Sequence, residues 1–205
     1  ILPVTDDPVA TRVVVAGEGE RQDRELSFQD WFVGHRHKLP VEAVRFDGAD
    51  RARAGPGVLA AIRSADVVVV APSNPVVSIA PVLAVPGVRD AVRARPDRVV
   101  AVSPIVAGRA LKGPAAELLD SMGEGASAVG VARWYVADVG TIVIDDSDAD
   151  DADAIRALGL RCTVTDTIML ARIDPANHMV DLLSIPRDLW VPIAGTGESA
   201  RINSA

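Results

Sequence analysis

The chain has 205 residues, of which 49% are hydrophobic and 24% are charged. It is therefore long enough for one substantial core, and its composition is far from that of disordered proteins. The formal net charge is −7, and no stripe of lysine or arginine is dense enough to neutralise a phosphate backbone, so we expect no nucleic-acid partner. No stretch approaches the ~20 apolar residues that cross a bilayer, so we expect no membrane segment and a cytoplasmic protein.

The first part of the chain alternates strand and helix patterns. A β-branched run predicts a strand at residues 11–16. A period-2 pattern predicts a strand with one solvent-exposed face at residues 41–46. Between them, aromatic residues at helical spacing predict a helix at residues 26–33, which Ser27 could cap. Apolar positions at helical spacing predict a second helix at residues 57–65.

Strand, loop and helix patterns then recur in tandem. The continuous apolar run at residues 66–71 is typical of a strand buried on both faces of a parallel sheet. Further strands are expected at residues 98–102, 141–145 and 161–164, and further helices from about residue 88 and at residues 115–122, 126–136 and 152–158. This alternation predicts an α/β fold, with an incomplete Rossmann-like sheet that is mostly parallel and has helices on both faces.

The pattern changes near residues 166–169. From Leu170 onward, two apolar runs, the second at residues 179–186, could pair as a hairpin across a polar turn at residues 175–178. We therefore divide the chain into an α/β domain over residues 1–166 and a short C-terminal segment with a β-hairpin over residues 167–205.

Two loops are the candidate binding elements, because ligands of open α/β sheets bind beyond the carboxyl ends of the strands. The loop at residues 72–81 supplies Ser73, Asn74 and Ser78 beside a helix start, where hydroxyl, amide and free backbone N–H groups could converge on an anion. The loop at residues 103–113 supplies a second set of candidate phosphate-binding residues: Ser103, Gly108, Arg109 and Lys112. Helix capping and turn formation are the alternative roles of such residues, and both interpretations stay open.

Acidic residues occur in two places where a metal could bind. Asp6 and Asp7 could hold a metal ion or form a turn, and the sequence favours neither. The acidic run at residues 145–153 departs from the EF-hand pattern, because the sixth position counted from Asp146 is Asp151 rather than glycine. We interpret this run as a solvated loop that caps a helix.

The segments PSNPVVSIAPVLAVPGVRDAV and AVSPIVAGRALKGPA resemble the 2-phospho-L-lactate transferase family, which includes phosphoenolpyruvate transferases of coenzyme F420 biosynthesis. The likeness runs over residues 1–169 and includes the strings ILPVTDDPVATRV, FQDWFV, ARWY and TVTDTIM. It implies transfer of a phospholactyl or enolpyruvyl-phosphoryl group from a guanylyl-activated donor to the hydroxyl of the deazaflavin Fo, with Mg²⁺ assistance and release of GMP. Small-molecule substrates are then the expected partners, and a homodimer is left open.

The resemblance also implies an incomplete transferase. Family members begin with a glycine-rich strand, loop and helix and an acidic deazaflavin-binding region, and both would lie before Ile1. Ala80 and Ala107 stand where glycine is common in the family. We therefore expect impaired activity, with a non-catalytic nucleotide-binding remnant as an alternative.

The end of the chain resembles a different family. The strings TDTIMLARIDP, LLSIPRDLWVPI and ARINSA, within residues 165–205, are similar to the start of the LytR-CpsA-Psr catalytic domain, a phosphotransferase that attaches glycopolymers to the cell wall. This resemblance implies that Asp166 helps to place Mg²⁺ and that Arg187 and Arg201 bind the pyrophosphate of a polyprenyl-linked donor. A fragment of such an enzyme is a second functional alternative. Because the TDTIM string ends one resemblance and begins the other, we interpret the chain as a junction of two partial genes or an assembled fusion.

Overall fold

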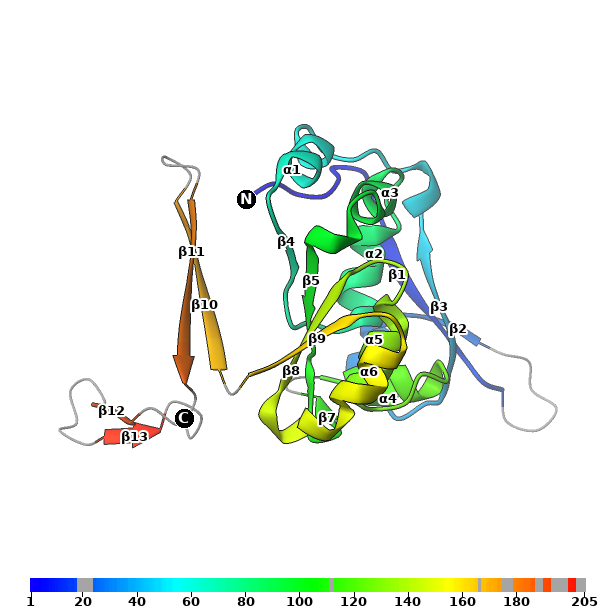
Figure 1. The fold of residues 1–205 in the computed structure, drawn as a ribbon. Coiled ribbons are helices and arrows are strands. Elements are labelled where there is room, and N and C mark those ends of the chain that lie inside the picture. The colour runs from blue at the N-terminus through cyan, green and yellow to red at the C-terminus, as the bar shows by residue number, and fades with distance from the viewer. Residues whose placement is uncertain are drawn as a thin grey trace.

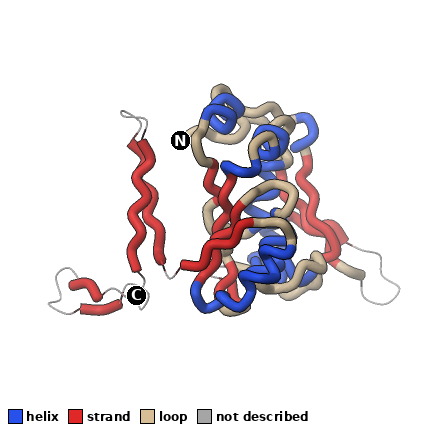
Figure 2. Tube along the Cα trace, viewed as in Figure 1, coloured by secondary structure: helices blue, strands red, loops and turns tan. Residues whose placement is uncertain are grey.

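The structure is a computed structural model, in which side chains are described up to residue 165. It describes residues 1–17, 24–110, 113–165, 167–174, 179–186, 190–192 and 199–201. Figure 1 shows an antiparallel sheet and a parallel sheet with helices between them, and Figure 2 shows the same arrangement by element type.

The antiparallel sheet has three strands in the order β2-β1-β3. Strand β1 (Ala10–Val15) lies between β2 (Arg24–Ser27) and β3 (Val41–Asp47) and pairs antiparallel with both. Its alternate residues Val13 and Val15 are buried in the core, as a period-2 strand with one apolar face requires. The sequence predicted β1 and β3, but not that they lie in a sheet of their own.

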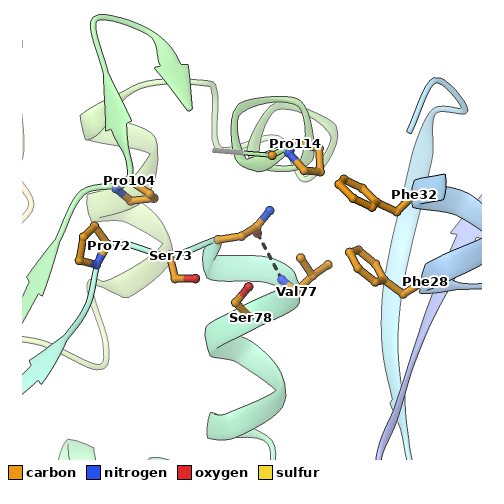
Figure 3. A pocket seen from close by; sticks show the side chains of 10 residues that line it. Phe28, Phe32, Pro72, Ser73, Val77, Ser78, Pro104 and Pro114 are labelled. Atoms are coloured by element: carbon orange, nitrogen blue, oxygen red, sulfur yellow. Dashed lines mark hydrogen bonds between the residues drawn. The ribbon is translucent and has the colours of Figure 1, made fainter. Parts of the chain in front are cut away.

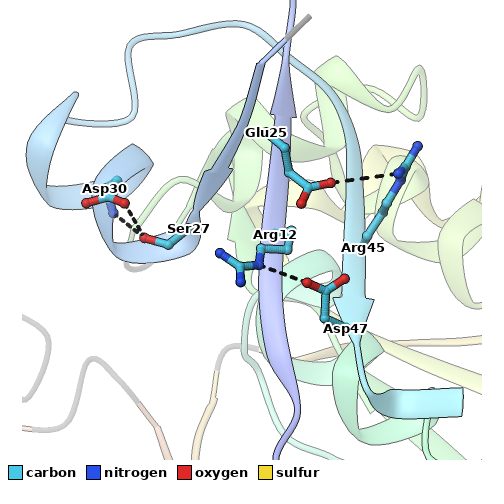
Figure 4. Close-up of polar contacts among 6 residues, drawn as sticks. All are labelled: Arg12, Glu25, Ser27, Asp30, Arg45 and Asp47. Atoms are coloured by element: carbon cyan, nitrogen blue, oxygen red, sulfur yellow. Dashed lines mark hydrogen bonds and ion pairs between the residues drawn. The ribbon is translucent and has the colours of Figure 1, made fainter. Parts of the chain in front are cut away.

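Polar contacts on this sheet and at its end are exposed (Figure 4). The Arg12 Nε atom lies 2.9 Å from Asp47 Oδ2, and the Arg45 Nη1 atom lies 3.7 Å from Glu25 Oε2. Such exposed pairs contribute at most about 1 kcal/mol each. The first pair joins the neighbouring strands β1 and β3, and the second joins β2 to β3 across the face of β1.

The helix predicted at residues 26–33 is shorter than expected. Ser27 lies at the end of β2, and its Oγ accepts the N–H of Asp30, the first residue of the helical turn η1 (Asp30–Gly34). Strand pairing with β1 takes the residues before this turn, which explains the late start of the helix.

The parallel sheet has four strands in sequence order. They are β4 (Val68–Val70), β5 (Val99–Val102), β8 (Thr141–Asp145) and β9 (Arg161–Thr165). Residues 141–144 of β8 are all buried, as expected for a central strand. By contrast, β4 lies at one edge, and Val67 and Val69 are 55% and 44% exposed. The expectation that residues 66–71 form a strand buried on both faces is therefore wrong.

Short helices flank the parallel sheet and confirm the predicted α/β class. The α-helices are α1 (Val58–Ser64), α2 (Ala80–Leu83), α3 (Val88–Arg93), α4 (Ala115–Ser121), α5 (Ala128–Tyr135) and α6 (Ala152–Ala157). Single turns occur at η2 (Ala49–Arg51), η3 (Pro75–Ile79), η4 (Pro96–Arg98) and η5 (Asp146–Asp151). Within the described residues, no helix combines the length and the apolar character that crossing a membrane would require.

One hydrophobic core joins the two sheets. Its buried members come from β1, from the helices and from the central strands, and include Val13, Leu118, Val131, Ile142 and Ile155. Because both sheets share this core, the loops at their ends are held in fixed positions relative to one another.

The C-terminal segment contains the predicted hairpin. Strand β10 (Thr167–Asp174) pairs antiparallel with β11 (Met179–Pro186) along its whole length. A second short pair joins β12 (Trp190–Pro192) to β13 (Ser199–Arg201). The domain boundary predicted at residue 166 stays a prediction, since Asp166 itself lies outside the described residues.

Candidate functional site

The loops that follow β4 and β5 meet at a pocket of about 480 Å³ (Figure 3). The pocket is lined by residues of both loops and by two aromatic residues: Phe28, Phe32, Pro72, Ser73, Asn74, Val77, Ser78, Pro104, Gly113 and Pro114. Its place beyond the carboxyl ends of neighbouring parallel strands is where open α/β sheets bind their ligands. The sequence analysis singled out both loops as candidate binding elements, and residues of each loop line this pocket.

Two of the predicted side chains present hydroxyl groups to the pocket. Ser73 is half-buried and Ser78 is exposed, and Figure 3 shows both side chains among those that line the pocket. Within the described part of the chain, neither hydroxyl takes part in a hydrogen bond. Both are therefore available to a bound molecule.

The helix start at this loop is capped by Asn74, which is 9% exposed. Its Oδ1 accepts the N–H groups of Val76 and Val77 at 2.9 and 3.2 Å, and its backbone carbonyl accepts those of Ser78 and Ile79 at 3.0 and 3.1 Å. The backbone donors that the sequence analysis expected to be free are thus occupied. An anion at this loop would be bound by side chains rather than by these four N–H groups.

Ser103 does not reach the pocket. It is 4% exposed, and its hydroxyl both donates to the carbonyl of Ile105 at 2.9 Å and accepts the N–H of Ile105 at 3.1 Å. This closed turn is the alternative role that the sequence left open for such a serine. Pro104, the next residue, lines the pocket in its place.

A small hairpin follows, formed by β6 (Ile105–Val106) and β7 (Arg109–Ala110). Its turn residues Ala107 and Gly108 both have positive φ, at 49° and 71°. A left-handed conformation is strained at alanine, so the hairpin needs support from elsewhere. Neither Gly108 nor the exposed Arg109 lines the pocket, and Lys112 lies outside the described residues.

The acidic run supplies that support. Both carboxylate oxygens of Asp148 accept the N–H of Ala107, at 3.0 and 3.1 Å. Burial raises the pKa of Asp148, with the charges of Asp151 and Asp145 adding to the effect and the Ala107 N–H opposing it. Asp145 caps the helical turn η5 by accepting the N–H of Ser147, as the solvated-loop interpretation predicted.

An aromatic pair forms the far side of the pocket. The rings of Phe28 and Phe32 stack with their centroids 5.4 Å apart and 11° between their planes. Behind them, Trp31 is buried and donates its Nε1–H to the carbonyl of Leu39 at 3.0 Å. Sequence analysis found the spacing of these aromatics but not their place, because the aromatic turn and the loop after β4 are far apart in the chain.

The residues proposed as metal ligands lie elsewhere. Asp7 accepts the N–H of Arg53 through Oδ2 at 2.8 Å and donates its own N–H to Thr5, so it tethers the N-terminal segment. Neither Asp7 nor the exposed Asp6 lines the pocket. Their role as metal ligands stays a prediction, and Asp166 lies outside the described residues.

The described residues do not fit a Mg²⁺ site. Magnesium is usually held by one or two carboxylates together with substrate phosphates. Within the described part of the chain, the pocket lining contains no carboxylate, and no group of three histidine, cysteine, aspartate or glutamate residues is close enough to share an ion. We therefore derive no step through this metal.

Together, the sheet and the pocket define an α/β protein with a ligand site at its strand ends. The family model of the 2-phospho-L-lactate transferase CofD matches residues 1–168, and the chain belongs to this family. A second model, the LytR_cpsA_psr family, matches residues 150–205 and overlaps the end of the first match. The pyrophosphate-binding roles of Arg187 and Arg201 stay predictions, since Arg187 and the side chain of Arg201 are outside the described part.

Curated relatives agree with the first match. The chain is 39% identical over 177 residues to a phosphoenolpyruvate transferase of Mycobacterium sp. (strain KMS). This match covers 86% of the chain and 53% of the relative. It is 46% identical over 164 residues to the phosphoenolpyruvate transferase of Thermobifida fusca (strain YX), with 78% of this chain and 50% of the relative covered. The chain thus spans about half the length of the curated relatives it matches.

A solved structure supports the fold. A UPF0052 family protein from Bacillus halodurans superposes with a TM-score of 0.52 at 18% identity, covering 81% of this chain and 55% of that one. At this identity the likeness concerns the fold alone.

Proposed function

We propose that this chain carries the donor-binding part of a transferase of coenzyme F420 biosynthesis. The complete reaction would move a phospholactyl or enolpyruvyl-phosphoryl group from a guanylyl-activated donor to the hydroxyl of Fo and release GMP. Family membership and the two named relatives support this assignment. The single observation that carries it is the pair of free hydroxyls, Ser73 and Ser78, that face one pocket at the strand ends.

The chemistry of the pocket suits a phosphorylated donor. Transfer of a phosphoryl group depends mainly on positioned donors that stabilise the oxygens around phosphorus. Ser73 and Ser78 can each donate one hydrogen bond to such oxygens. The Asp148 contact to Ala107 braces the hairpin after β5. The second loop, which contributes Pro104 and Gly113 to the pocket lining, is thereby held near the first.

The proposal predicts that the chain binds GDP. Isothermal titration calorimetry should give a measurable affinity, and Ser73→Ala combined with Ser78→Ala should weaken it by about a hundredfold or more, because hydrogen bonds to charged groups contribute about 1.5–3 kcal/mol each. Ser64→Ala is a matched control, since Ser64 lies at the end of α1 and its hydroxyl donates to the carbonyl of Ala61 at 3.4 Å. Absence of heat at millimolar GDP, or equal affinities in all three proteins, would contradict the proposal.

A further inference from the structure

A second pocket lies apart from the one at the strand ends. It has a volume of about 490 Å³ and is lined by residues of η1, of the turn that leads into β3, and of α4. The two pockets share no lining residue. The second pocket therefore needs an explanation of its own.

The floor of the second pocket is apolar and rigid. Trp31, Val41 and Leu118 line it and belong to the buried core. Leu39, which is half-buried, and Pro40, which is exposed, continue this apolar surface outward. A ligand with an apolar part would cover this surface and remove it from water.

One edge of the pocket carries the cationic side chain of Lys38 and the imidazole of His37. The turn that presents them is held by its backbone, because His37 N–H donates to the carbonyl of Trp31 at 3.0 Å and Lys38 N–H donates to that of His35 at 3.2 Å. The His37 ring also stacks on Phe32, with the ring centroids 5.5 Å apart and 22° between the planes. These contacts fix the position of the cationic edge.

Helix α4 supplies an edge of the opposite character. Glu117 and Ser121 both line the pocket and lie one helical turn apart, so they share a face of the helix. The Ser121 hydroxyl donates to the carbonyl of Glu117 at 2.8 Å, which leaves its oxygen able to accept. Within the part of the chain that the structure describes, the side chains of Glu117 and Lys38 form no ion pair and no hydrogen bond.

We propose that this second pocket binds a small zwitterion of the amino acid class that has an apolar side chain. Lys38 and His37 bind the carboxylate, Glu117 binds the ammonium group, and the apolar side chain packs against Leu39 and Pro40. A ligand with a single charge would satisfy one edge and leave the other unpaired. This inference goes beyond the proposed function and does not depend on it.

Three probes with the same phenyl ring test the two edges separately. They are L-phenylalanine, hydrocinnamate, which lacks the amino group, and phenethylamine, which lacks the carboxylate. We expect calorimetry to show that L-phenylalanine binds and that each analogue binds about tenfold more weakly, because each loses one charge-assisted contact. Absence of heat at millimolar L-phenylalanine, or an analogue that binds as tightly, would overturn the proposal.

Substitutions at the two edges should then have opposite selectivity. Glu117→Gln should weaken L-phenylalanine and phenethylamine by about tenfold without weakening hydrocinnamate. Lys38→Gln should weaken L-phenylalanine and hydrocinnamate without weakening phenethylamine. Damage to the fold does not produce this crossed pattern, and an equal loss for all three probes in either variant would overturn the proposal.

Two neighbouring charges provide matched controls. Asp120 is exposed on the same helix as Glu117, and Arg36 is exposed in the same turn as Lys38, but neither lines the pocket. Asp120→Asn and Arg36→Gln should leave all three affinities unchanged. Losses as large as those of Glu117→Gln and Lys38→Gln would show that the net charge of the surface, rather than this pocket, attracts the probes.

The first pocket is tested as the alternative location. The combined substitution of Ser73 and Ser78 by alanine should leave the affinity for L-phenylalanine unchanged, since neither serine lines the second pocket. A loss in that variant would place the zwitterion in the first pocket and overturn the proposal. Failure of the unaltered chain to bind GDP would overturn the proposed function alone.

Discussion

Among the described residues, Asp138 is the single buried carboxylate, and it is 3% exposed. Its Oδ1 lies 2.6 Å from Arg93 Nε, and its Oδ2 lies 3.8 Å from Arg89 Nη1. Burial, reinforced by the charge of Asp138, raises the pKa of neighbouring Tyr135, so this phenol stays protonated throughout the physiological range. The cluster joins α3 to the turn after α5, and we assign it a structural role.

Arg93→Ala should therefore destabilise the protein. It leaves a buried carboxylate with a single cation at the longer distance, and we expect the free energy of unfolding to fall by about 2 kcal/mol in urea denaturation. The control is Arg156→Ala, whose partner Asp153 is 95% exposed, and which should cost less than about 0.5 kcal/mol. Equal losses in the two variants would contradict the structural role of Asp138.

At the scale of the element, helix α5 depends on a glycine for its packing. A Cβ atom at Gly130 would lie 2.0 Å from the carbonyl oxygen of Gly125 and 2.7 Å from that of Glu124. The backbone before α5 therefore approaches the helix more closely than any side chain allows.

Gly130→Ala should lower stability by about 1–3 kcal/mol, although alanine is the better helix former. Thermal unfolding of the variant would measure the effect. Gly34→Ala is the matched control, because a Cβ there meets nothing within 4 Å, and it should be neutral or stabilising. A higher melting temperature for Gly130→Ala would show that the close approach is not maintained.

The elements also show what sequence could and could not predict. The strands β5, β8 and β9 of the parallel sheet were predicted because their β-branched runs are a local signal. The strand β2, with the sequence RELS, has no such signal and forms because β1 pairs with it. Pairing depends on residues distant in the chain, which a local pattern does not contain.

The same distinction applies to the site. The serines of the loop after β4 could be predicted from the rule for strand ends, and the pocket contains them. The sequence does not show that Asn74 accepts the backbone N–H groups at this helix start. It also does not show that Phe28 and Phe32 line the same pocket, because both features depend on the tertiary structure. Capping by asparagine was one of the alternatives, and only the structure decides between them.

At the scale of the whole molecule, the edge strand β4 is the exposed feature. It pairs with β5 on one side, no described strand pairs with its other side, and Val69 is 44% exposed. An unprotected edge with apolar side chains is a template for pairing with another chain. The homodimer left open by the sequence stays a prediction.

We expect concentration-dependent association, measured by light scattering, and Val69→Lys should reduce it because a charge on an edge strand opposes pairing. Val33→Lys is the control, since Val33 is 69% exposed but lies in the helical turn η1 rather than at a sheet edge. A monomer at every concentration, or an equal reduction by the two substitutions, would contradict a role for this edge.

The order of the parallel sheet has a kinetic consequence. Strands β4, β5, β8 and β9 lie side by side in the order in which they occur in the chain. During synthesis, each new strand can pair with the one completed just before it, without waiting for a later segment to be inserted between them. The sheet can therefore grow in one direction from β4, with the loop bearing Ser73 in place before the loop after β5 is made.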